Sequence, residues 1–196
     1  EIQATAILDM QLRRLAALER QKIVDEAAEL ERLIADYNDI LLDTKSLVTH
    51  VAREILGKTD LVYRGREIAL APVWERVTVA EAFLQFAGWD PSAKFDADRF
   101  DLDLVDKVEP QLPMNVPVVL ADYPAEAAAL ARRKPGAPRV AERWELFIGG
   151  LELANAYSEL NDPAEQRARF DECAQQRKKL GKMVYPLDEE FLAVIS

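Results

Sequence analysis

Hydrophobic residues in the first quarter of the chain recur at helical spacing. Alternating steps of four and three residues connect Ile23, Ala27, Leu30, Ile34, Tyr37 and Leu41. This heptad pattern is flanked mainly by charged side chains, and neither glycine nor proline occurs in residues 1–56. The pattern predicts a helix that pairs with a second chain as a homodimer, or folds back as a helical hairpin on a helix formed by residues 2–15.

The pattern becomes mixed after residue 56, with short alternating and short helical stretches. Thr78 and Glu81 form a capping box ahead of one helix, and Asp162 followed by Pro163 is typical of the start of another. The predicted elements are a hairpin over 61–70, a helix from 78 to 88, an aspartate-rich helix with an acidic solvent face within 91–110, a strand over 118–121, a helix from 162 to about 180 and a last helix over 187–195. We therefore expect an α+β fold, in which helices flank an antiparallel sheet centred on residues 144–159.

Residues 141–162 are the best candidate for a ligand site. The pattern predicts a strand, a tight turn at Gly149 and Gly150, and a second strand, so that Glu145 and Glu152 share one face. Two carboxylates on one face repel each other unless a cation or a hydrogen-bond donor lies between them. Magnesium takes oxygen ligands of this kind, usually together with phosphates.

Two further polar residues lie on the second strand. Asn155 and Glu159 have the parity opposite to that of Glu152, so they either face away from it or are re-aimed by a bulge near Leu153. The small residues Gly149 and Gly150 would let a bulky group approach the backbone and are candidate pocket residues. The alternative is an edge hairpin whose acidic face is simply solvated.

The composition and net charge of the chain disfavour some classes of binding partner. The chain has 35 acidic and 25 basic side chains and a formal net charge of −10, which disfavours nonspecific binding to nucleic acid or to anionic membranes. No apolar run approaches the ~20 residues that span a bilayer. A single cysteine cannot form an internal disulfide, which fits a cytoplasmic protein. Because the chain starts at Glu1 without a methionine or a signal-peptide pattern, we expect it to be a piece of something longer.

The run ERWELFIGGLELANAYSELNDPAEQRARF resembles the segment before the last signature motif of class II lysyl-tRNA synthetases. It is still more similar to their shortened paralogue, the elongation factor P–lysine ligase, and the similarity extends over residues 43–196. The tRNA-charging enzymes usually carry a serine-proline pair after the DYP step, whereas this chain has AEAAA, which favours the ligase-like paralogue.

The resemblance implies ATP-dependent activation of lysine or β-lysine and its transfer to elongation factor P. By this resemblance Glu145 and Glu152 hold ATP and Mg²⁺. By the same resemblance Asn155 and Glu159 bind the amino acid, and Glu159 pairs with its positively charged amine.

The run EIQATAILDMQLRRLAALERQKI carries a different resemblance, to the segment of the DNA gyrase A subunit that enters its coiled-coil arm. It covers residues 1–42 and implies a structural or dimerising helical module without catalysis. The junction between the two similarities lies between Ala35 and Leu47, so a chimera or a truncated gene is an open alternative.

The three signature motifs of a class II synthetase domain do not appear in this sequence. Two of them supply arginines that neutralise charge while the adenylate forms. We therefore expect the isolated chain not to catalyse, and the absence of an anticodon-binding barrel leaves tRNA binding without support. Three hypotheses result: a fragment of a lysine-type ligase, a structural helical module, or a module that binds ATP or an amino acid without chemistry.

Overall fold

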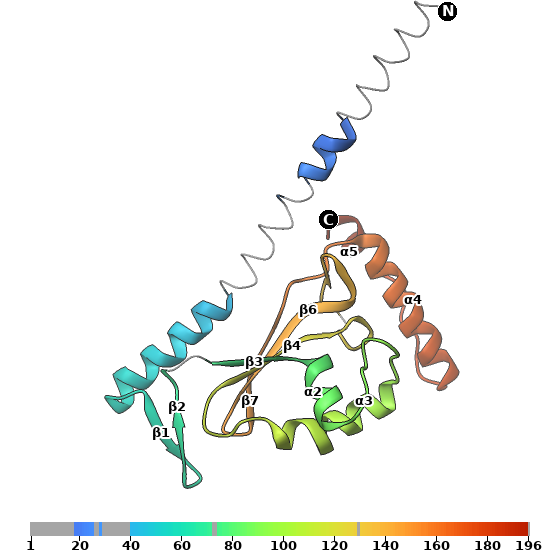
Figure 1. Cartoon of the computed structure of the whole chain (residues 1–196). Coiled ribbons are helices and arrows are strands. Elements are labelled where there is room, and N and C mark those ends of the chain that lie inside the picture. The colour runs from blue at the N-terminus through green and yellow to red at the C-terminus, as the bar shows by residue number, and fades with distance from the viewer. Residues whose placement is uncertain (1–17, 26–27, 29–39, 72–73, 129, 196) are drawn as a thin grey trace, which may run out of the picture. The chain divides into compact units, whose positions relative to one another are not determined.

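The computed structural model describes residues 18–25, 28, 40–71, 74–128 and 130–195 (Figure 1). The chain divides into two compact units, residues 1–46 and residues 47–196, which are described separately. In the first unit, residues 18–25 and 40–46 are helical, as the pattern predicts. Most of the heptad and the predicted pairing of helices fall outside the described residues.

The second unit begins with helical residues, which end at residue 56, and a small hairpin. Strands β1 (Asp60–Tyr63) and β2 (Arg66–Ala69) are antiparallel and joined by Arg64 and Gly65. Both turn residues have positive φ, of 50° and 76°, which is the geometry of a tight two-residue hairpin turn. The predicted hairpin is therefore confirmed.

A mixed five-stranded sheet forms the centre of this unit. Its strands are β3 (Glu75–Thr78), β4 (Val118–Pro124), β5 (Arg133–Lys134), β6 (Ala137–Ile148) and β7 (Leu151–Tyr157). The order is β3-β4-β6-β5, and β7 also pairs with β6. The predicted α+β class is confirmed. The sheet is mixed because β3 and β4 run parallel, whereas β6 is antiparallel to β4, β5 and β7.

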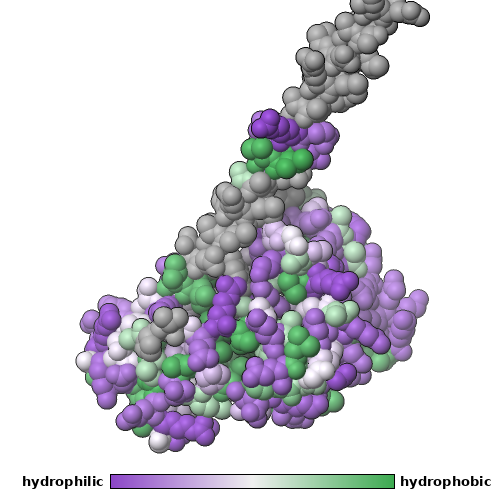
Figure 2. All heavy atoms as spheres, in the orientation of Figure 1, coloured by the Kyte–Doolittle hydropathy of each residue, from purple (hydrophilic) through white to green (hydrophobic). Residues whose placement is uncertain are grey.

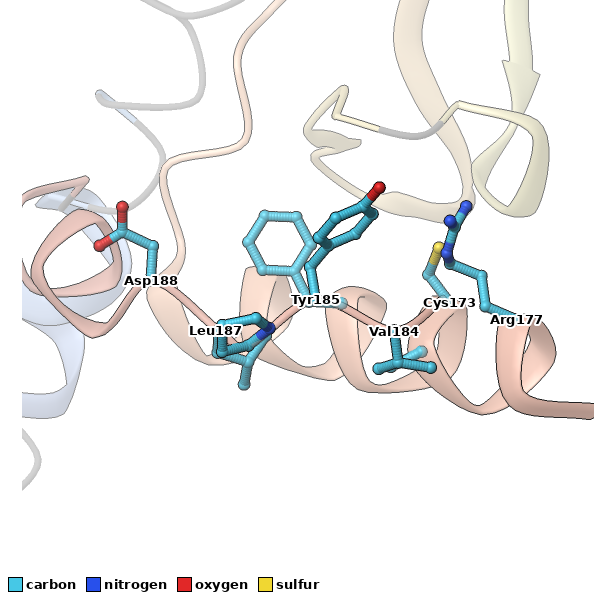
Figure 3. Close-up of a pocket in the computed structure, with 9 residues that line it drawn as sticks. Cys173, Arg177, Val184, Tyr185, Leu187 and Asp188 are labelled. Atoms are coloured by element: carbon cyan, nitrogen blue, oxygen red, sulfur yellow. The ribbon is translucent and has the colours of Figure 1, made fainter. Parts of the chain in front are cut away.

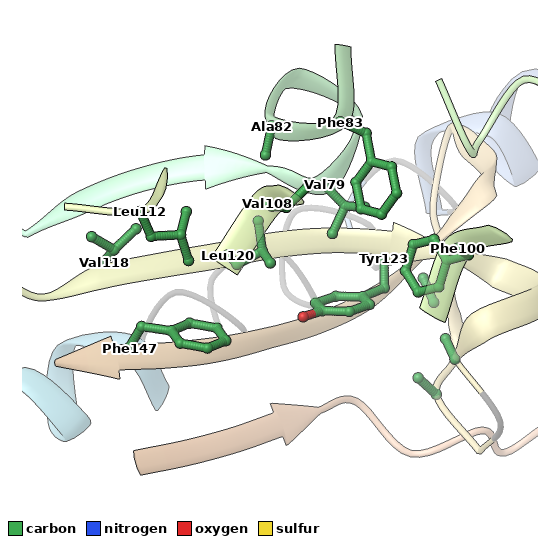
Figure 4. Close-up of a cluster of buried hydrophobic side chains, with 13 residues drawn as sticks. Val79, Ala82, Phe83, Phe100, Val108, Leu112, Val118, Leu120, Tyr123 and Phe147 are labelled. Atoms are coloured by element: carbon green, nitrogen blue, oxygen red, sulfur yellow. The ribbon is translucent and has the colours of Figure 1, made fainter. Parts of the chain in front are cut away.

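The hydrophobic core packs helices against the sheet (Figure 4). Helix α2 (Val79–Phe86) starts at the predicted capping box and is followed by α3 (Ala97–Asp103) and by the helical turns η1 (Leu104–Val108) and η2 (Glu109–Gln111). Phe83 from α2 stacks on Phe100 from α3 at a centroid distance of 4.9 Å. Tyr123 from β4 belongs to the same cluster and is 1% exposed.

One aspartate of the predicted acidic helix face is buried. Asp103 accepts hydrogen bonds from Trp89 Nε1 at 2.8 Å and from Arg99 Nε at 3.3 Å, and forms an ion pair with Lys107. A buried carboxylate is tolerated when its oxygens are paired in this way. The expectation of a uniformly solvated acidic face is therefore wrong at Asp103.

The C-terminal part follows the predicted pattern. A short turn, η3 (Ala125–Ala127), follows β4, and the chain ends with α4 (Pro163–Lys179) and α5 (Glu189–Val194). Asp162 caps α4 by accepting hydrogen bonds from the backbone of Ala164 and Glu165. In the part of the chain that the structure describes, no helix has the length and apolar character needed to cross a membrane.

Hydrophobic side chains gather in separate clusters on the visible face of the molecule (Figure 2). Within the second unit, helical residues 47–56 and the tips of β6 and β7 line an apolar groove of about 440 Å³. Ile148 and Leu153 contribute to this groove from the sheet. The sheet residues that alternate with them belong to the opposite face, where the predicted site lies.

Candidate functional site

The β6–β7 hairpin turns at Gly149 and Gly150, as predicted. Ile148 pairs with Leu151 and Phe147 with Glu152, so the two glycines are the central turn residues. Their φ angles are 60° and 79°, a conformation that costs glycine little. A Cβ on Gly149 would lie 2.7 Å from Ile68 Cδ1, and one on Gly150 would lie 2.8 Å from Met114 Sδ. The missing side chains therefore let the turn pack closely against its surroundings.

A bulge in β7 brings the polar residues of the second strand onto the face of Glu145. Phe147 pairs with Glu152, but the next residue of β6, Leu146, pairs with Ala154, so Leu153 is an extra residue without a partner. Asn155 consequently lies opposite Glu145. The predicted alternative in which a bulge near Leu153 re-aims Asn155 is confirmed.

Glu145 is buried, and three donors hold its carboxylate. The residue is 5% exposed. Its Oε2 accepts a hydrogen bond from the Tyr123 hydroxyl at 2.5 Å. Its Oε1 accepts one from Arg143 Nη2 at 2.6 Å and one from Asn155 Nδ2 at 3.2 Å. These contacts compensate the cost of burying the carboxylate.

Arg143 lies two residues before Glu145 and therefore on the same face of β6. Besides Glu145, its guanidinium contacts the carbonyl oxygen of Ala127, to which Nη1 donates at 3.0 Å. It also lies over the Tyr123 ring, with Cζ 4.6 Å from the centroid. The side chain is 21% exposed. Arg143 thus links Glu145, the ring of Tyr123 and the η3 turn.

Tyr123 reaches this face because β4 is irregular at Asp122. Ala121 pairs with Trp144 and Tyr123 with Ala141, so β6 has one more residue than β4 between these pairs. Asp122 has a φ of 59°, in the left-handed region that aspartate tolerates better than most residues. Lys134 Nζ donates to Asp122 Oδ2 at 2.6 Å. Burial above all, with a contribution from the Glu145 charge, raises the pKa of Tyr123 well above its usual value, so its hydroxyl acts as a donor.

Burial and neighbouring negative charge raise the pKa values of two other carboxylates near the hairpin. Partial burial, followed by the charge of Glu145, raises the pKa of Glu152, and Arg143 opposes this effect. Burial, followed by the charges of Glu145 and Glu152, raises the pKa of Glu109 in η2. A cation at this face would relieve both effects.

The structure does not bring Glu159 into this group. It follows the end of β7, is exposed, and pairs with Ala131 in an isolated bridge. Within the described residues, its side chain makes no hydrogen bond to Glu145, Glu152 or Asn155. Its predicted role toward an amine stays a prediction.

Gly149 and Gly150 line a separate cavity of about 240 Å³, together with Tyr63, Arg64, Arg66 and Met114. The neighbours that approach the glycines are thus side chains of the protein itself. Their predicted role as pocket backbone for a ligand stays a prediction.

The donor set at the hairpin fits Mg²⁺ held jointly with phosphates. Among the described residues, no group of three or more His, Cys, Asp or Glu side chains could hold a metal ion alone. Magnesium commonly binds through one or two carboxylates and completes its shell with phosphate oxygens and water. Glu145 and Glu152 provide two such carboxylates, and Glu152 has no hydrogen-bond partner among the described residues.

Two further cavities lie in this unit, and the first contains residues of the site. One of about 290 Å³ is lined by Tyr123, Arg143 and Glu145 on one side and by Phe95 and Phe100 on another. A second, of about 250 Å³, lies between α4 and residues 184–188 (Figure 3). There Arg177 Nε donates to the Met183 carbonyl oxygen at 2.7 Å, and the single cysteine, Cys173, lines the cavity. None of the predicted site residues lines this second cavity.

Two residues of the site, Arg143 and Tyr123, were not predicted. The position of Arg143 follows from strand alternation, since residues two apart share a face. The position of Tyr123 does not follow from alternation, because it depends on the left-handed residue before it. The only signal in the sequence is that aspartate tolerates the left-handed region better than most residues.

Comparisons with known proteins place most of the chain in one family. Residues 26–195 match the family model described as tRNA synthetases class II (D, K and N). A lysine–tRNA ligase of Clostridium perfringens (strain SM101 / Type A) is 35% identical over 191 residues, which cover 86% of this chain and 38% of that ligase. For the lysine–tRNA ligase of Pelotomaculum thermopropionicum, the identity is 37% over 187 residues, or 84% of this chain and 37% of that ligase.

The chain therefore spans less than two fifths of the length of these relatives. The family match begins at residue 26, inside the segment 1–42 that resembles the gyrase arm. The predicted domain boundary at residues 42 and 43 stays a prediction.

Proposed function

The chain belongs to the class II tRNA synthetases (D, K and N), and on this basis we propose that its β6–β7 hairpin binds ATP with Mg²⁺ and a lysine-type amino acid. The observation that carries the proposal is the shared face of Glu145, Glu152 and Asn155, which the Leu153 bulge produces. The lysine–tRNA ligases that this chain is similar to suggest lysine as the amino acid. The resemblance to the elongation factor P–lysine ligase leaves β-lysine as the alternative.

In this proposal, Glu145 and Glu152 hold the metal and the ATP phosphates. Bound Mg²⁺ would neutralise charge that develops on the phosphates when the amino-acid carboxylate attacks the α-phosphorus and pyrophosphate leaves. Asn155 contacts Glu145 and would orient the amino acid beside it. Glu159 would accept a hydrogen bond from the substrate's ammonium group.

We further propose that the acceptor of the activated amino acid is a lysine of elongation factor P. The AEAAA run after Pro124, in place of the serine-proline pair of tRNA-charging enzymes, supports this acceptor. The net charge of −10 also supports it, because acidic proteins attract tRNA weakly. The expectation that the isolated chain does not catalyse stays a prediction.

Calorimetric titration of the 196-residue chain tests the proposal. The ligands are Mg²⁺–ATP and, separately with Mg²⁺, a non-hydrolysable lysyl-adenylate analogue. We expect Glu152→Gln to weaken both ligands and Glu159→Gln to weaken only the analogue, each by about tenfold, the usual effect of losing a charged hydrogen-bond partner. Glu67→Gln, in the exposed part of β2, is the matched control and should change neither affinity. Absence of saturable binding to a chain with a cooperative unfolding transition would refute the proposal.

A second role is favoured by the first unit. Leu18, Ile23 and Val24 are large hydrophobic residues on a helical segment, and they are 60%, 63% and 53% exposed. Such side chains are commonly covered by a partner helix. We propose that residues 1–42 form the dimerising helical module that the gyrase-like sequence implies.

A further inference from the structure

We propose that Arg143 and Tyr123 are positioning residues for Glu145, and that Arg143 makes the site prefer a metal ion already bound to a polyphosphate over the bare ion. The inference rests on the proposed function of the hairpin. It assigns roles to two residues outside the predicted site, and it specifies the form in which the metal arrives.

Glu145 has few acceptor positions left for a cation. A carboxylate has two oxygens and about four lone-pair positions. On Oε1, two positions are taken by Arg143 Nη2 and Asn155 Nδ2, at 2.6 Å and 3.2 Å. On Oε2, one is taken by the Tyr123 hydroxyl at 2.5 Å. A cation therefore reaches Glu145 through the remaining position on Oε2 and binds through one oxygen.

The donors Tyr123 and Arg143 are themselves held in place. Tyr123 is 1% exposed and packs in the hydrophobic core (Figure 4). Arg143 is held by the carbonyl oxygen of Ala127 and by the ring of Tyr123. Glu145 cannot rotate toward a ligand without breaking contacts to both residues, so its free position has a set direction. Fixing a ligand group in this way reduces the entropy lost on binding.

The charges around Glu145 act differently on a bare metal ion and on a metal–nucleotide complex. The carboxylates of Glu109, Glu145 and Glu152 and the guanidinium of Arg143 give a sum of −3 + 1 = −2 when all are ionised. The guanidinium repels a bare dication that approaches Glu145, but it attracts the phosphate oxygens of a metal–nucleotide complex. Of its five N–H groups, two donate in the structure, to Glu145 and Ala127; of the other three, the Nε–H is buried, so the two on Nη1 and Nη2 are left for phosphate oxygens. Arg143 should therefore act in opposite directions on the two forms of the metal.

The test measures, by calorimetric titration, the affinity of the whole chain for Mn²⁺ and, separately, for preformed Mn²⁺–ATP. Manganese replaces magnesium because both suit carboxylate and phosphate oxygens. For Arg143→Gln we expect bare Mn²⁺ to bind about tenfold more tightly and Mn²⁺–ATP about tenfold more weakly. The reason is that the lost positive charge repels the bare cation but attracts the phosphates of Mn²⁺–ATP. Tyr123→Phe should weaken both forms by about threefold and leave their ratio unchanged, because it removes one neutral donor.

Two controls keep the result specific. Arg132→Gln removes an arginine that pairs with Glu142 at 2.6 Å, away from the Glu145 carboxylate, and should leave both affinities unchanged. Arg143→Lys keeps the positive charge, so the preference for Mn²⁺–ATP should persist, although lysine cannot bridge Glu145 and Ala127. This variant tests the role of the charge even if Arg143→Gln fails to fold.

The outcomes separate the two proposals. Equal affinities of the wild-type chain for Mn²⁺ and Mn²⁺–ATP, or a change of both affinities in the same direction in Arg143→Gln, would overturn the inference alone. No binding of Mn²⁺–ATP to a folded wild-type chain would overturn it together with the proposed function. Loss of the preference in Arg143→Lys would also overturn it, since the charge is then not its cause.

Discussion

At the scale of single residues, the site contains charges that the fold alone does not favour. Glu145 is compensated by three donors, whereas Glu152 faces the charge of Glu145 and has a raised pKa because of burial and that charge. A group whose pKa is raised on folding binds its proton more tightly in the folded state. The contribution of Glu152 to the free energy of unfolding is therefore greatest below the ordinary glutamate pKa. It is lost as the pH rises through the pKa of Glu152 in the folded state.

Glu152→Gln should accordingly stabilise the empty protein at neutral pH. The gain should be less than about 1 kcal/mol, because Glu152 is exposed enough for solvent to screen its repulsion. Thermal unfolding without metal, from about pH 4 to about pH 8, should show the variant gaining on the wild type as the pH rises. Adding Mg²⁺–ATP should reverse the order, since the wild type binds this ligand about tenfold more tightly than the variant and is stabilised more by it. A variant less stable than the wild type at neutral pH without ligand would contradict the argument.

At the scale of elements, two strand irregularities assemble the site. Leu153 is the extra residue in β7 that places Asn155 opposite Glu145, and Asp122 marks the irregularity between β4 and β6 that brings Tyr123 to the same face. A regular sheet would distribute these side chains over both faces.

The irregularities also explain how far the sequence could predict the site. The hairpin, its turn and the shared face of Glu145 and Glu152 follow from alternation and from the glycine pair, and the structure confirms them. Strand alternation alone allowed Asn155 to lie on either face of the sheet. The choice depends on whether the strand has a bulge, and a bulge is set by packing around the strand. Nothing in the alternation pattern could place Tyr123, since its orientation depends on the positive φ of Asp122.

The bulge leads to a counterintuitive prediction about strand length. Deleting Leu153 removes the extra residue but leaves Ala154 opposite Leu146 and Asn155 opposite Glu145, so Mg²⁺–ATP affinity should stay within about threefold. Inserting one alanine after Leu153 should instead let the strands pair without a bulge, which moves Asn155 two residues, about 7 Å, along the strand to lie opposite Arg143, and weakens binding at least about tenfold. Calorimetry on both variants, with far-ultraviolet circular dichroism to verify folding, measures this. Strong loss of affinity in the deletion variant would show that the bulge itself is required.

At the scale of the whole molecule, two units with different patterns share one chain. Residues 47–196 have a buried core between helices and sheet, whereas the described helical residues of the first unit expose large hydrophobic side chains. The heptad pattern predicts that a second helix covers them.

Ile23→Asp should therefore weaken self-association. Sedimentation velocity from about 1 µM to about 100 µM should show a concentration-dependent dimer for the wild type and a shift toward monomer for the variant, because a charge is buried in the helical contact. Gln21→Asp adds the same charge at a polar position of the same helical segment and should not shift the equilibrium. A wild-type chain that stays monomeric over this range would contradict the dimerising role.

The Gly149–Gly150 turn has a mechanical consequence. A hairpin that is free at its tip bends like a beam clamped at one end, and the separation of groups on its two strands fluctuates with that bending. Here the glycines let Ile68 and Met114 approach the tip closely, while β4 supports β6 along its length. The hairpin is thus supported at its tip as well as along one side, and this support limits changes in the separation between Glu145 on β6 and Glu152 on β7.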